Sequence, residues 1–205
     1  MDKKKNKHLN REKNILYTGF GDKGTTTLFN CEQGRISKSA NIIEALGSVD
    51  ELNAYLGIVK VSAESEEVQI KIGSKNVLYS SLVDEIQQTL FIIQAEIAGS
   101  KMTVSRKDLN RIEKIINIIG DILPPITSFT VSGGSILSAE LDYARALTRM
   151  VERRIITITE EEGSKKIGVL TLSYLNRLSS VFFALSRYAN FILSIPESHP
   201  KYNIE

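Results

Sequence analysis

Apolar residues recur every three or four positions through most of the chain after residue 40, which is the spacing of helices that bury one face. The pattern predicts five helices: about 41–63, about 77–98, a third between Ser105 and Pro124, a fourth from Ser135 to about 159, and a fifth over about 166–193. Long helices of this kind pack antiparallel. The predicted fold class is therefore all-α, a five-helix bundle with the packing of four-helix and ferritin-like bundles.

Several residues mark where these helices begin and end. Ser105 and Asp108 have capping-box spacing, and Ser135 is placed to cap the fourth helix. Gly99 is a plausible stop for the second helix, and Pro124 ends the third. The β-branched run 155–159 would also suit a strand, but the helical period continues through it and favours a helix.

Three regions lack the helical period. Residues 64–76 are charged and contain Gly73, which predicts a loop. Residues 15–40 are rich in glycine and threonine and predict an extended segment in front of the bundle. Residues 1–14 are basic and polar and predict a disordered arm, so that one domain is expected over 15–205.

Composition narrows the chemistry. The chain has 205 residues and a net charge of only +2, which does not indicate a nucleic-acid partner. It has one cysteine, Cys31, and two histidines, His8 and His199, near opposite ends. We therefore expect neither a His/Cys metal site nor a Ser-His-Asp or Cys-His catalytic site. Without a membrane-length apolar run or an apolar signal region, we expect a cytoplasmic protein that does not enter membranes.

The first candidate for chemistry is the segment 17–27. Its glycines at 19, 21 and 24 let backbone amides approach an anion, and its hydroxyls and Lys23 add donors. The spacing fits G-x-G-x-x-G, but the residues after Gly24 look extended and do not open a helix, as a dinucleotide site requires. From these residues alone, phosphate binding and an ordinary glycine-rich turn are equally supported.

Arginines form the second candidate. Arg145, Arg149 and Glu152 share one face of the fourth helix, close enough to its apolar stripe for partial burial. Arginine there suits bidentate contact with phosphate oxygens. An ion-paired helix surface, with Asp142 and Glu152 as partners, explains the same pattern without a ligand and is the commoner case.

Two more segments have a functional and a structural interpretation. Asn176 interrupts the apolar stripe of the fifth helix, which indicates a specific hydrogen bond to a ligand or to another helix. Asp50 and Glu51 could bind a cation or pair with an arginine of another helix. Alternatively, Ser48 and Glu51 could cap a helix start.

Taken together, these segments resemble the trimeric class of ATP:cob(I)alamin adenosyltransferases. That family has motifs of the type T-K-x-G-D-x-G-T, G-T-V-D-E-L-N, F-x-x-P-G-G-S, A-R-x-x-x-R-R-x-E-R-R and Y-L-N-R-L-S-D. This chain has corresponding segments, in the same order, at 18–27, 47–53, 129–135, 144–154 and 174–179. Each motif alone is weak, but the set is specific and spans about residues 17–190.

The resemblance implies a five-helix bundle that assembles as a homotrimer, with ATP between neighbouring subunits and the corrinoid close by. In the family's reaction, the Co(I) of cob(I)alamin attacks the 5′ carbon of ATP, adenosylcobalamin forms and triphosphate leaves. The corrinoid supplies the nucleophile, so the protein needs no histidine or cysteine for it. A corrinoid reductase or an adenosylcobalamin-dependent enzyme would be a further partner.

The resemblance also assigns site residues. ATP is expected to contact Thr18, Gly19, Phe20, Gly21, Thr26, Thr27, Lys38, Arg149, Glu152, Arg153 and Asn176. Positive charge there would stabilise the triphosphate leaving group, and Mg²⁺ would share this work through the phosphates. Asp50 and Arg145 match an ion pair that bridges two subunits beside the corrinoid, and with Arg149 they are the expected catalytic residues. Phe129 matches an aromatic that replaces the lower axial ligand and favours four-coordinate Co(II).

Four positions depart from the family's pattern. Gly19 stands where the family usually has lysine, and Met150 where it often has a second arginine, so both remove positive charge from the expected phosphate site. Ser132 replaces the turn proline, and Ser180 replaces the aspartate of the last motif. Lys23 is the candidate to compensate for Gly19.

Two other functions stay open at this point. One is a different ATP- or phosphate-binding enzyme on the same bundle, because fold does not fix function. The other is a non-catalytic oligomeric protein in which the arginine stripe forms an interface. The first predicts ATP turnover without cobalamin, and the second predicts no nucleotide binding.

Overall fold

The computed structural model describes residues 16–29, 34–161 and 166–202. Those residues form the five helices α1 (Asn41–Ser65), α2 (Tyr79–Ile97), α3 (Arg106–Ile122), α4 (Ile136–Glu160) and α5 (Val169–Ile192). Two short antiparallel hairpins complete the fold: β1 (Thr25–Thr26) with β2 (Ile36–Ser37), and β3 (Gln69–Ile72) with β4 (Lys75–Leu78). The predicted all-α, five-helix fold is confirmed. The basic arm, His8 and Cys31 lie outside the described residues.

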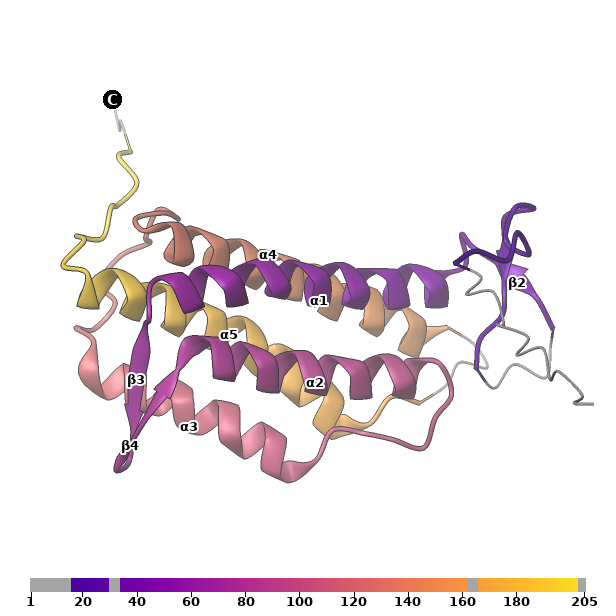
Figure 1. The fold of residues 1–205 in the computed structure, drawn as a ribbon, viewed down its shortest axis with the longest axis horizontal. Coiled ribbons are helices and arrows are strands. Elements are labelled where there is room, and N and C mark those ends of the chain that lie inside the picture. The colour runs from indigo at the N-terminus through magenta and orange to yellow at the C-terminus, as the bar shows by residue number, and fades with distance from the viewer. Residues whose placement is uncertain (1–15, 30–33, 162–165, 203–205) are drawn as a thin grey trace, which may run out of the picture.

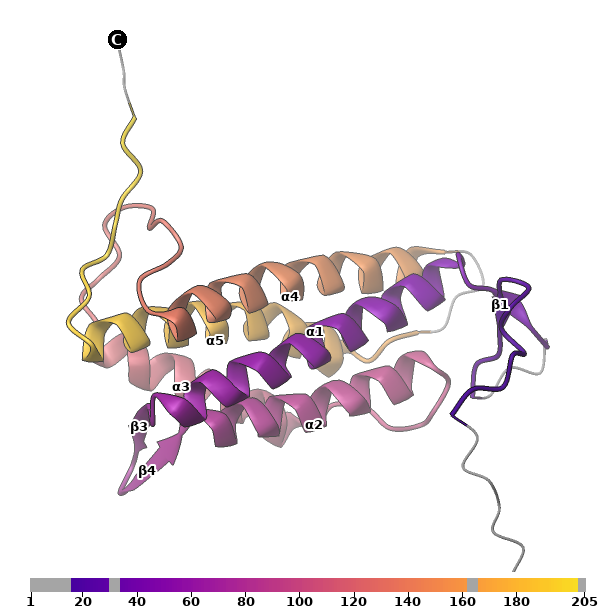
Figure 2. The ribbon, with the colours of Figure 1, turned by 45° about the horizontal axis from the view of Figure 1, so that its top comes forward.

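The helices lie side by side along one long axis (Figures 1 and 2). α4 packs against both α5 and α1, α1 packs against α2, and α3 packs against α5. The Asn41 side chain at the start of α1 donates a hydrogen bond to Glu161, just after the end of α4, so these two helices are antiparallel. The β1–β2 segment lies at one end of the bundle. The α3–α4 loop, the β3–β4 hairpin and the chain after α5 lie at the other (Figure 1).

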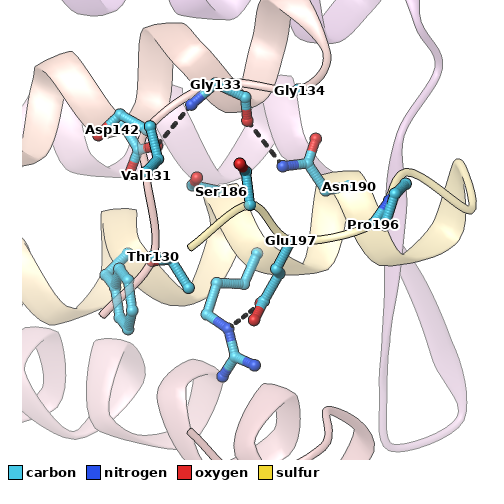
Figure 3. Close-up of a pocket in the computed structure, with 13 residues that line it drawn as sticks. Thr130, Val131, Gly133, Gly134, Asp142, Ser186, Asn190, Pro196 and Glu197 are labelled. Carbon is cyan, nitrogen blue, oxygen red and sulfur yellow. Dashed lines mark hydrogen bonds and ion pairs between the residues drawn. The ribbon is translucent and has the colours of Figure 1, made fainter. Parts of the chain in front are cut away.

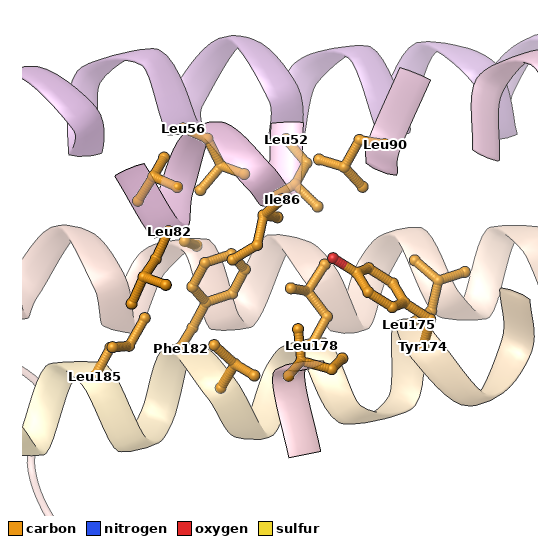
Figure 4. Packing of buried hydrophobic residues seen from close by; sticks show 14 of the residues in the cluster. Leu52, Leu56, Leu82, Ile86, Leu90, Tyr174, Leu175, Leu178, Phe182 and Leu185 are labelled. Carbon is orange, nitrogen blue, oxygen red and sulfur yellow. The ribbon is translucent and has the colours of Figure 1, made fainter. Parts of the chain in front are cut away.

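The apolar stripes meet in a continuous core (Figure 4). Its centre is formed by side chains that are almost completely buried, from α1 (Leu52, Leu56), α2 (Leu82, Ile86, Leu90) and α5 (Tyr174, Leu175, Leu178, Phe182, Leu185). Among the described helices, α5 alone is long and apolar enough to cross a membrane, but half of its most apolar window is buried in the bundle. Its apolar character is that of a core helix.

Helix-end signals in the sequence are mostly confirmed. Ser105 and Asp108 form the predicted capping box, and the Ser135 hydroxyl accepts from the Ser138 amide at the start of α4. The run 155–159 is helical as predicted. The Thr157 hydroxyl donates to the Arg153 carbonyl one helical turn earlier, so the helix itself provides a hydrogen-bond partner for this polar side chain.

Two element boundaries were predicted wrongly. Residues 64–76 are not only a loop, because β3 and β4 form a hairpin that turns at Gly73, whose φ is +64°. The alternation of buried Ile70 and Ile72 with exposed neighbours is a strand signal that the surrounding charges obscured.

The fifth helix begins at Val169 and not at about 166. The preceding Gly168 is extended, and its amide donates to the Glu96 carboxylate over 2.7 Å. The Thr171 hydroxyl donates to the other oxygen of Glu96 over 2.6 Å. A buried carboxylate from α2 therefore sets the start of α5, which local sequence could not show.

Candidate active site

The glycine- and threonine-rich segment is organised around Arg35. Its guanidinium donates to the Phe20 carbonyl over 2.5 Å, the Thr25 carbonyl over 2.6 Å and the Thr25 hydroxyl over 2.8 Å. Lys38 follows β2 directly, and its Nζ would lie only 2.9 Å from a Cβ added at Gly21. Glycine at 21 thus admits the Lys38 ammonium to the loop. Sequence reasoning missed Arg35, whose role appears only when the hairpin brings β1 and β2 together.

The departure at Gly19 has a conformational counterpart. Its φ is +69°, a region that favours glycine over lysine, and its carbonyl accepts from the Asp22 amide to close a tight turn. Gly24 is also left-handed, and β1 follows it directly. The absence of a helix at this point confirms that the G-x-G-x-x-G spacing is not a dinucleotide motif.

Large apolar side chains of this segment are left uncovered. Leu16, Tyr17, Phe20 and Phe29 are between 75% and 95% exposed. So much apolar surface in one short stretch is typical of an interaction site. The segment therefore combines hydrogen-bond donors with an exposed apolar surface.

On α4, the arginines differ in burial and in partners. Arg149 and Arg153 are exposed, whereas Arg145 is half-buried. The expectation of partial burial is confirmed for Arg145 and wrong for Arg149. Arg145 Nε lies 3.8 Å from Asp142 Oδ1 and is buried without a hydrogen bond within the described chain. The interpretation of the stripe as an ion-paired surface is therefore confirmed for Arg145, which pairs with Asp142, and wrong for Arg149, which has no ion pair among the described residues.

Asn176 joins α5 to α4. Its Nδ2 donates to Glu152 Oε1 over 3.1 Å, and its Oδ1 accepts from the Arg177 guanidinium over 2.7 Å. The structural interpretation, a hydrogen bond between helices, is thus confirmed, and it places two expected ATP ligands side by side. Both residues keep one face toward solvent, where a nucleotide could reach them.

A cavity of about 400 Å³ lies where the α3–α4 loop meets α4 and α5. It collects three residues that the resemblance selected, Phe129, Arg145 and Arg149, together with Ser180. Phe129 is 79% exposed, so its ring projects from the loop without packing against the core. The cavity thus combines an aromatic ring with two guanidinium groups. Phe183, which also lines it, was not selected from the sequence.

The loop that carries Phe129 ends in a tight glycine turn held by Asn190 (Figure 3). Asn190 Nδ2 donates to the Gly133 carbonyl over 2.8 Å, and its Oδ1 accepts from the Ser135 amide over 3.0 Å. Gly134 has a φ of +111°, and a Cβ there would lie 2.3 Å from Asn190 Oδ1. Asn190 was missed as well; its signal is a polar residue at a buried position of an apolar helix.

Asp50 lies apart from this cavity. It is exposed on α1, where Gln94 Nε2 lies 3.4 Å from its carboxylate, and within the described chain it forms no ion pair with Arg145. The alternative role of this motif as a helix start is wrong, because Ser48 is buried inside α1 and its hydroxyl donates to the Ala45 carbonyl.

The expected ATP ligands fall into two groups. The Gly/Thr-rich segment lies near the end of α4, while the Phe129 loop precedes its start (Figure 1). α4 has 25 residues and is therefore about 37 Å long, with Arg149, Glu152 and Arg153 near its middle. Among the described residues, no three His, Cys, Asp or Glu side chains gather closely enough to hold a metal ion.

A sequence profile described as cobalamin adenosyltransferase matches residues 16–189, most of the chain. The chain belongs to the cobalamin adenosyltransferase family. The resemblance inferred from its motifs is thus confirmed. This family member is 32% identical over 179 residues to the corrinoid adenosyltransferase PduO of Citrobacter freundii, covering 84% of this chain and 49% of that protein. It is 31% identical over 182 residues to the corrinoid adenosyltransferase of Bacillus subtilis, covering 85% of this chain and 86% of that one.

The chain thus spans about half the length of the PduO relatives and most of the shorter ones. The fold agrees with solved structures of the family. A variant PduO-type ATP:corrinoid adenosyltransferase from Lactobacillus reuteri, complexed with cobalamin and ATP, superposes with a TM-score of 0.78 at 29% identity, covering 91% of this chain and 97% of that one. A second variant of that enzyme, complexed with ATP, gives a TM-score of 0.76.

Proposed function

We propose that this protein transfers the 5′-deoxyadenosyl group of ATP to the cobalt of cob(I)alamin. In this reaction the Co(I) electron pair forms the cobalt–carbon bond, the bond between C5′ and the triphosphate oxygen breaks, and triphosphate leaves. The observation that carries the proposal is the cavity shared by Phe129, Arg145 and Arg149 in a member of this family. An aromatic ring suits a corrinoid face, and the guanidinium groups suit an anionic leaving group.

In this proposal, Arg149 binds the triphosphate. Its guanidinium is exposed, lines the cavity and has no partner within the described chain, so it is available for phosphate oxygens. Charge at this position acts most strongly when the leaving group develops its own charge. Mg²⁺ would be held through the phosphates, with carboxylates such as Glu152 close by.

Phe129 would stand against the lower face of the corrinoid. The ring has no nitrogen atom that could coordinate the cobalt on that face. An apolar neighbour there favours four-coordinate Co(II), which is easier to reduce to Co(I). The residue contributes by excluding a ligand and water, and it takes no part in electron or proton transfer.

ATP would be bound where two copies of the chain meet, in a homotrimer. Two observations support this arrangement. The expected ATP ligands lie in two groups: the Gly/Thr-rich segment is near the end of α4, and the arginines and Glu152 are near the middle of that helix (Figure 1). In addition, the Gly/Thr-rich segment exposes Leu16, Tyr17, Phe20 and Phe29. A neighbouring subunit would cover these side chains and bring Thr18, Gly21 and Lys38 to the arginines of another copy.

The same assembly accounts for Asp50 and Arg145. Within one chain they are unpaired with each other, and Arg145 Nε is buried without a hydrogen bond. A buried guanidinium nitrogen of this kind calls for an acceptor. Asp50 of a neighbouring subunit would supply that acceptor beside the corrinoid.

The deciding experiment is an anaerobic assay with purified protein, Mg·ATP and chemically reduced cobalamin, in which the visible spectrum is followed for adenosylcobalamin. Protein-dependent formation of the product supports the proposal. ATP turnover that needs no cobalamin would indicate another ATP-dependent enzyme on this bundle. With Co(I) confirmed present, no product and no nucleotide binding would indicate a helical interaction protein.

A further inference from the structure

After α5, residues 195–199 run back along the loop that carries Phe129. The Val131 amide donates to the Ser198 carbonyl over 2.7 Å, and the two residues form an isolated antiparallel bridge. Glu197, from the same segment, lines a pocket with the loop residues Thr130 and Val131, and its carboxylate points to a side chain of α5 (Figure 3). The segment therefore forms one wall beside the loop and is joined to it by backbone as well as side chains.

Arg187 ties this segment to the bundle. Its side chain is only 9% exposed, its Nε donates to Glu197 Oε1 over 2.5 Å, and its Nη2 donates to the Pro124 carbonyl over 3.1 Å. One buried guanidinium therefore holds both the 195–199 segment and the start of the α3–α4 loop. Residues 195–199 thus have a fixed base from which they can position the loop.

His199 makes the contact nearest to the cavity. Its Nδ1 lies 2.9 Å from the Phe129 carbonyl and 2.9 Å from the Ser128 hydroxyl. A carbonyl oxygen can only accept, so Nδ1 must carry the hydrogen and donate it to Phe129. Among the described residues, His199 is the one that hydrogen-bonds to the Phe129 backbone.

The need for such a tie follows from the exposure of Phe129. Its ring is 79% exposed and is not fixed by core packing, so its direction depends on the backbone that carries it. Asn190 fixes that backbone after the loop, at Gly133 and Ser135. Arg187 fixes it before the loop, at Pro124. Within the described chain, His199 and the Val131–Ser198 bridge hold the centre of the loop.

We infer that His199 is a positioning residue for the corrinoid site: by donating from Nδ1 to the Phe129 carbonyl, it holds the Phe129 ring where the lower face of the corrinoid would lie. The inference rests on the proposed function, since it assigns His199 a role through Phe129. His199 acts on the loop and not on the substrate. It should therefore affect corrinoid binding and cobalt coordination while leaving ATP binding unchanged.

The test compares three full-length variants with the wild type. His199→Ala removes the donor, while His199→Asn retains a side-chain amide donor at a similar distance from the backbone. Ser198→Ala is the matched control, because it changes the neighbouring side chain and keeps the carbonyl that accepts from Val131. Thermal unfolding confirms that each variant is folded.

Two readouts separate this inference from the proposed function. The first is amide hydrogen exchange over residues 126–131 without any ligand, which should rise about fivefold in His199→Ala if one hydrogen bond is lost. The second is the electron paramagnetic resonance spectrum of cob(II)alamin with protein and ATP, which reports the four-coordinate fraction. In steady-state assays, KM for the corrinoid should rise about fivefold and KM for ATP should stay the same.

We expect His199→Ala to raise exchange and lower the four-coordinate fraction, His199→Asn to restore most of both, and Ser198→Ala to match the wild type. Unchanged exchange in His199→Ala would overturn the inference, as would a wild-type four-coordinate fraction in that variant. An equal effect of Ser198→Ala would also count against it. If the wild type binds cob(II)alamin and forms no four-coordinate species, the proposed role of Phe129 fails, while exchange still decides whether His199 holds the loop.

Discussion

At the Phe129 end of the bundle, the chain holds its own loop in place, whereas at the opposite end the Gly/Thr-rich segment depends mainly on Arg35. The Phe129 loop is tied by Asn190, Arg187 and His199, all from α5 or the chain after it. In the Gly/Thr-rich segment, the Arg35 side chain bonds to Phe20 and Thr25.

The difference indicates how the two halves of the site are completed. One chain suffices to shape the proposed corrinoid cavity, because α5 and the chain after it supply partners for its loop. The Gly/Thr-rich segment presents glycines, hydroxyls and exposed apolar side chains, and it would gain its final contacts from ATP and a neighbouring subunit. We therefore expect changes at the two ends to affect different properties.

The largest effect is expected where the two ends would meet, at Arg149. Arg149→Ala should lower kcat/KM by about 100-fold or more, because it removes a positive charge from the leaving triphosphate. The melting temperature should stay close to the wild-type value, since Arg149 is exposed and unpaired within the described chain. Steady-state kinetics and calorimetry measure the two. Arg154→Ala is the control, because Arg154 lies on the same helix as Arg149 but outside the cavity, where it pairs with Glu44 of α1. An active Arg149→Ala protein would rule out the phosphate assignment.

The Phe129 end should be sensitive to Gly134→Ala. The new Cβ would lie 2.3 Å from Asn190 Oδ1 at a φ of +111°, so Asn190 could move only by losing its bonds to Gly133 and Ser135. We expect the free energy of unfolding to fall by about 3 kcal/mol in urea titrations. Gly120→Ala, in an exposed part of α3 with no atom near the new Cβ, should instead stabilise by about 0.5 kcal/mol. Equal effects of the two changes would contradict the role of this turn.

Phe129→Ala tests whether this end serves the corrinoid alone. Loss of the ring should weaken corrinoid activation by about tenfold while ATP affinity changes little, because the expected ATP ligands other than Arg149 lie elsewhere. Separate titrations with ATP and with cobalamin measure the two affinities. Ile126→Ala removes apolar surface from the same cavity and should have a smaller effect. A parallel loss of both affinities would argue against the axial role.

The opposite end should respond to Phe20→Ala through assembly. Phe20 is 75% exposed in one chain, so its loss should leave the unfolding of a subunit nearly unchanged and weaken the proposed trimer by about 1 to 2 kcal/mol per buried ring. Sedimentation equilibrium over a range of concentrations measures this. Tyr202→Ala, similarly exposed at the other end, serves as the control. If Phe20→Ala assembles like the wild type, this segment does not form the interface.

The smallest effect concerns Tyr55 in the middle of the bundle, where α1 packs against α4. Burial, with help from Glu140 and Tyr143, raises the pKa of Tyr55 to about 12. The unfolded chain loses this proton near pH 10, so stability from Tyr55 is present below that pH and declines between about pH 10 and 12. Tyr55→Phe should flatten this decline in unfolding measured across alkaline pH. An unchanged slope would show that other groups dominate there.

The helices and their caps could be read from the sequence because the signals are local. Stripes, the Ser105–Asp108 capping box and the Ser135 cap each involve residues a few positions apart. The start of α5 and the role of Asn190 could not be read in this way. The start of α5 depends on Glu96 of α2, and the role of Asn190 depends on the Gly133–Gly134 turn, and both partners are far away in the sequence.

For the site, motif order was more informative than residue chemistry. Chemistry alone favoured an ion-paired stripe on α4, but Arg149 is unpaired and lines a cavity with Phe129. The resemblance selected both residues, each for a different ligand, and the structure places them in one cavity. Arg35 and His199 were missed because each donates to backbone carbonyls. Every residue type has a backbone carbonyl, so the partner's identity in the sequence gives no sign of such a bond.

The Glu96 carboxylate has a consequence for protein engineering. By accepting from the Gly168 amide and the Thr171 hydroxyl, it fixes where α5 starts independently of the residues that lead into it. Insertions between Glu161 and Lys166 should therefore leave the helical register unshifted. That junction is where we would splice a reporter domain into the chain.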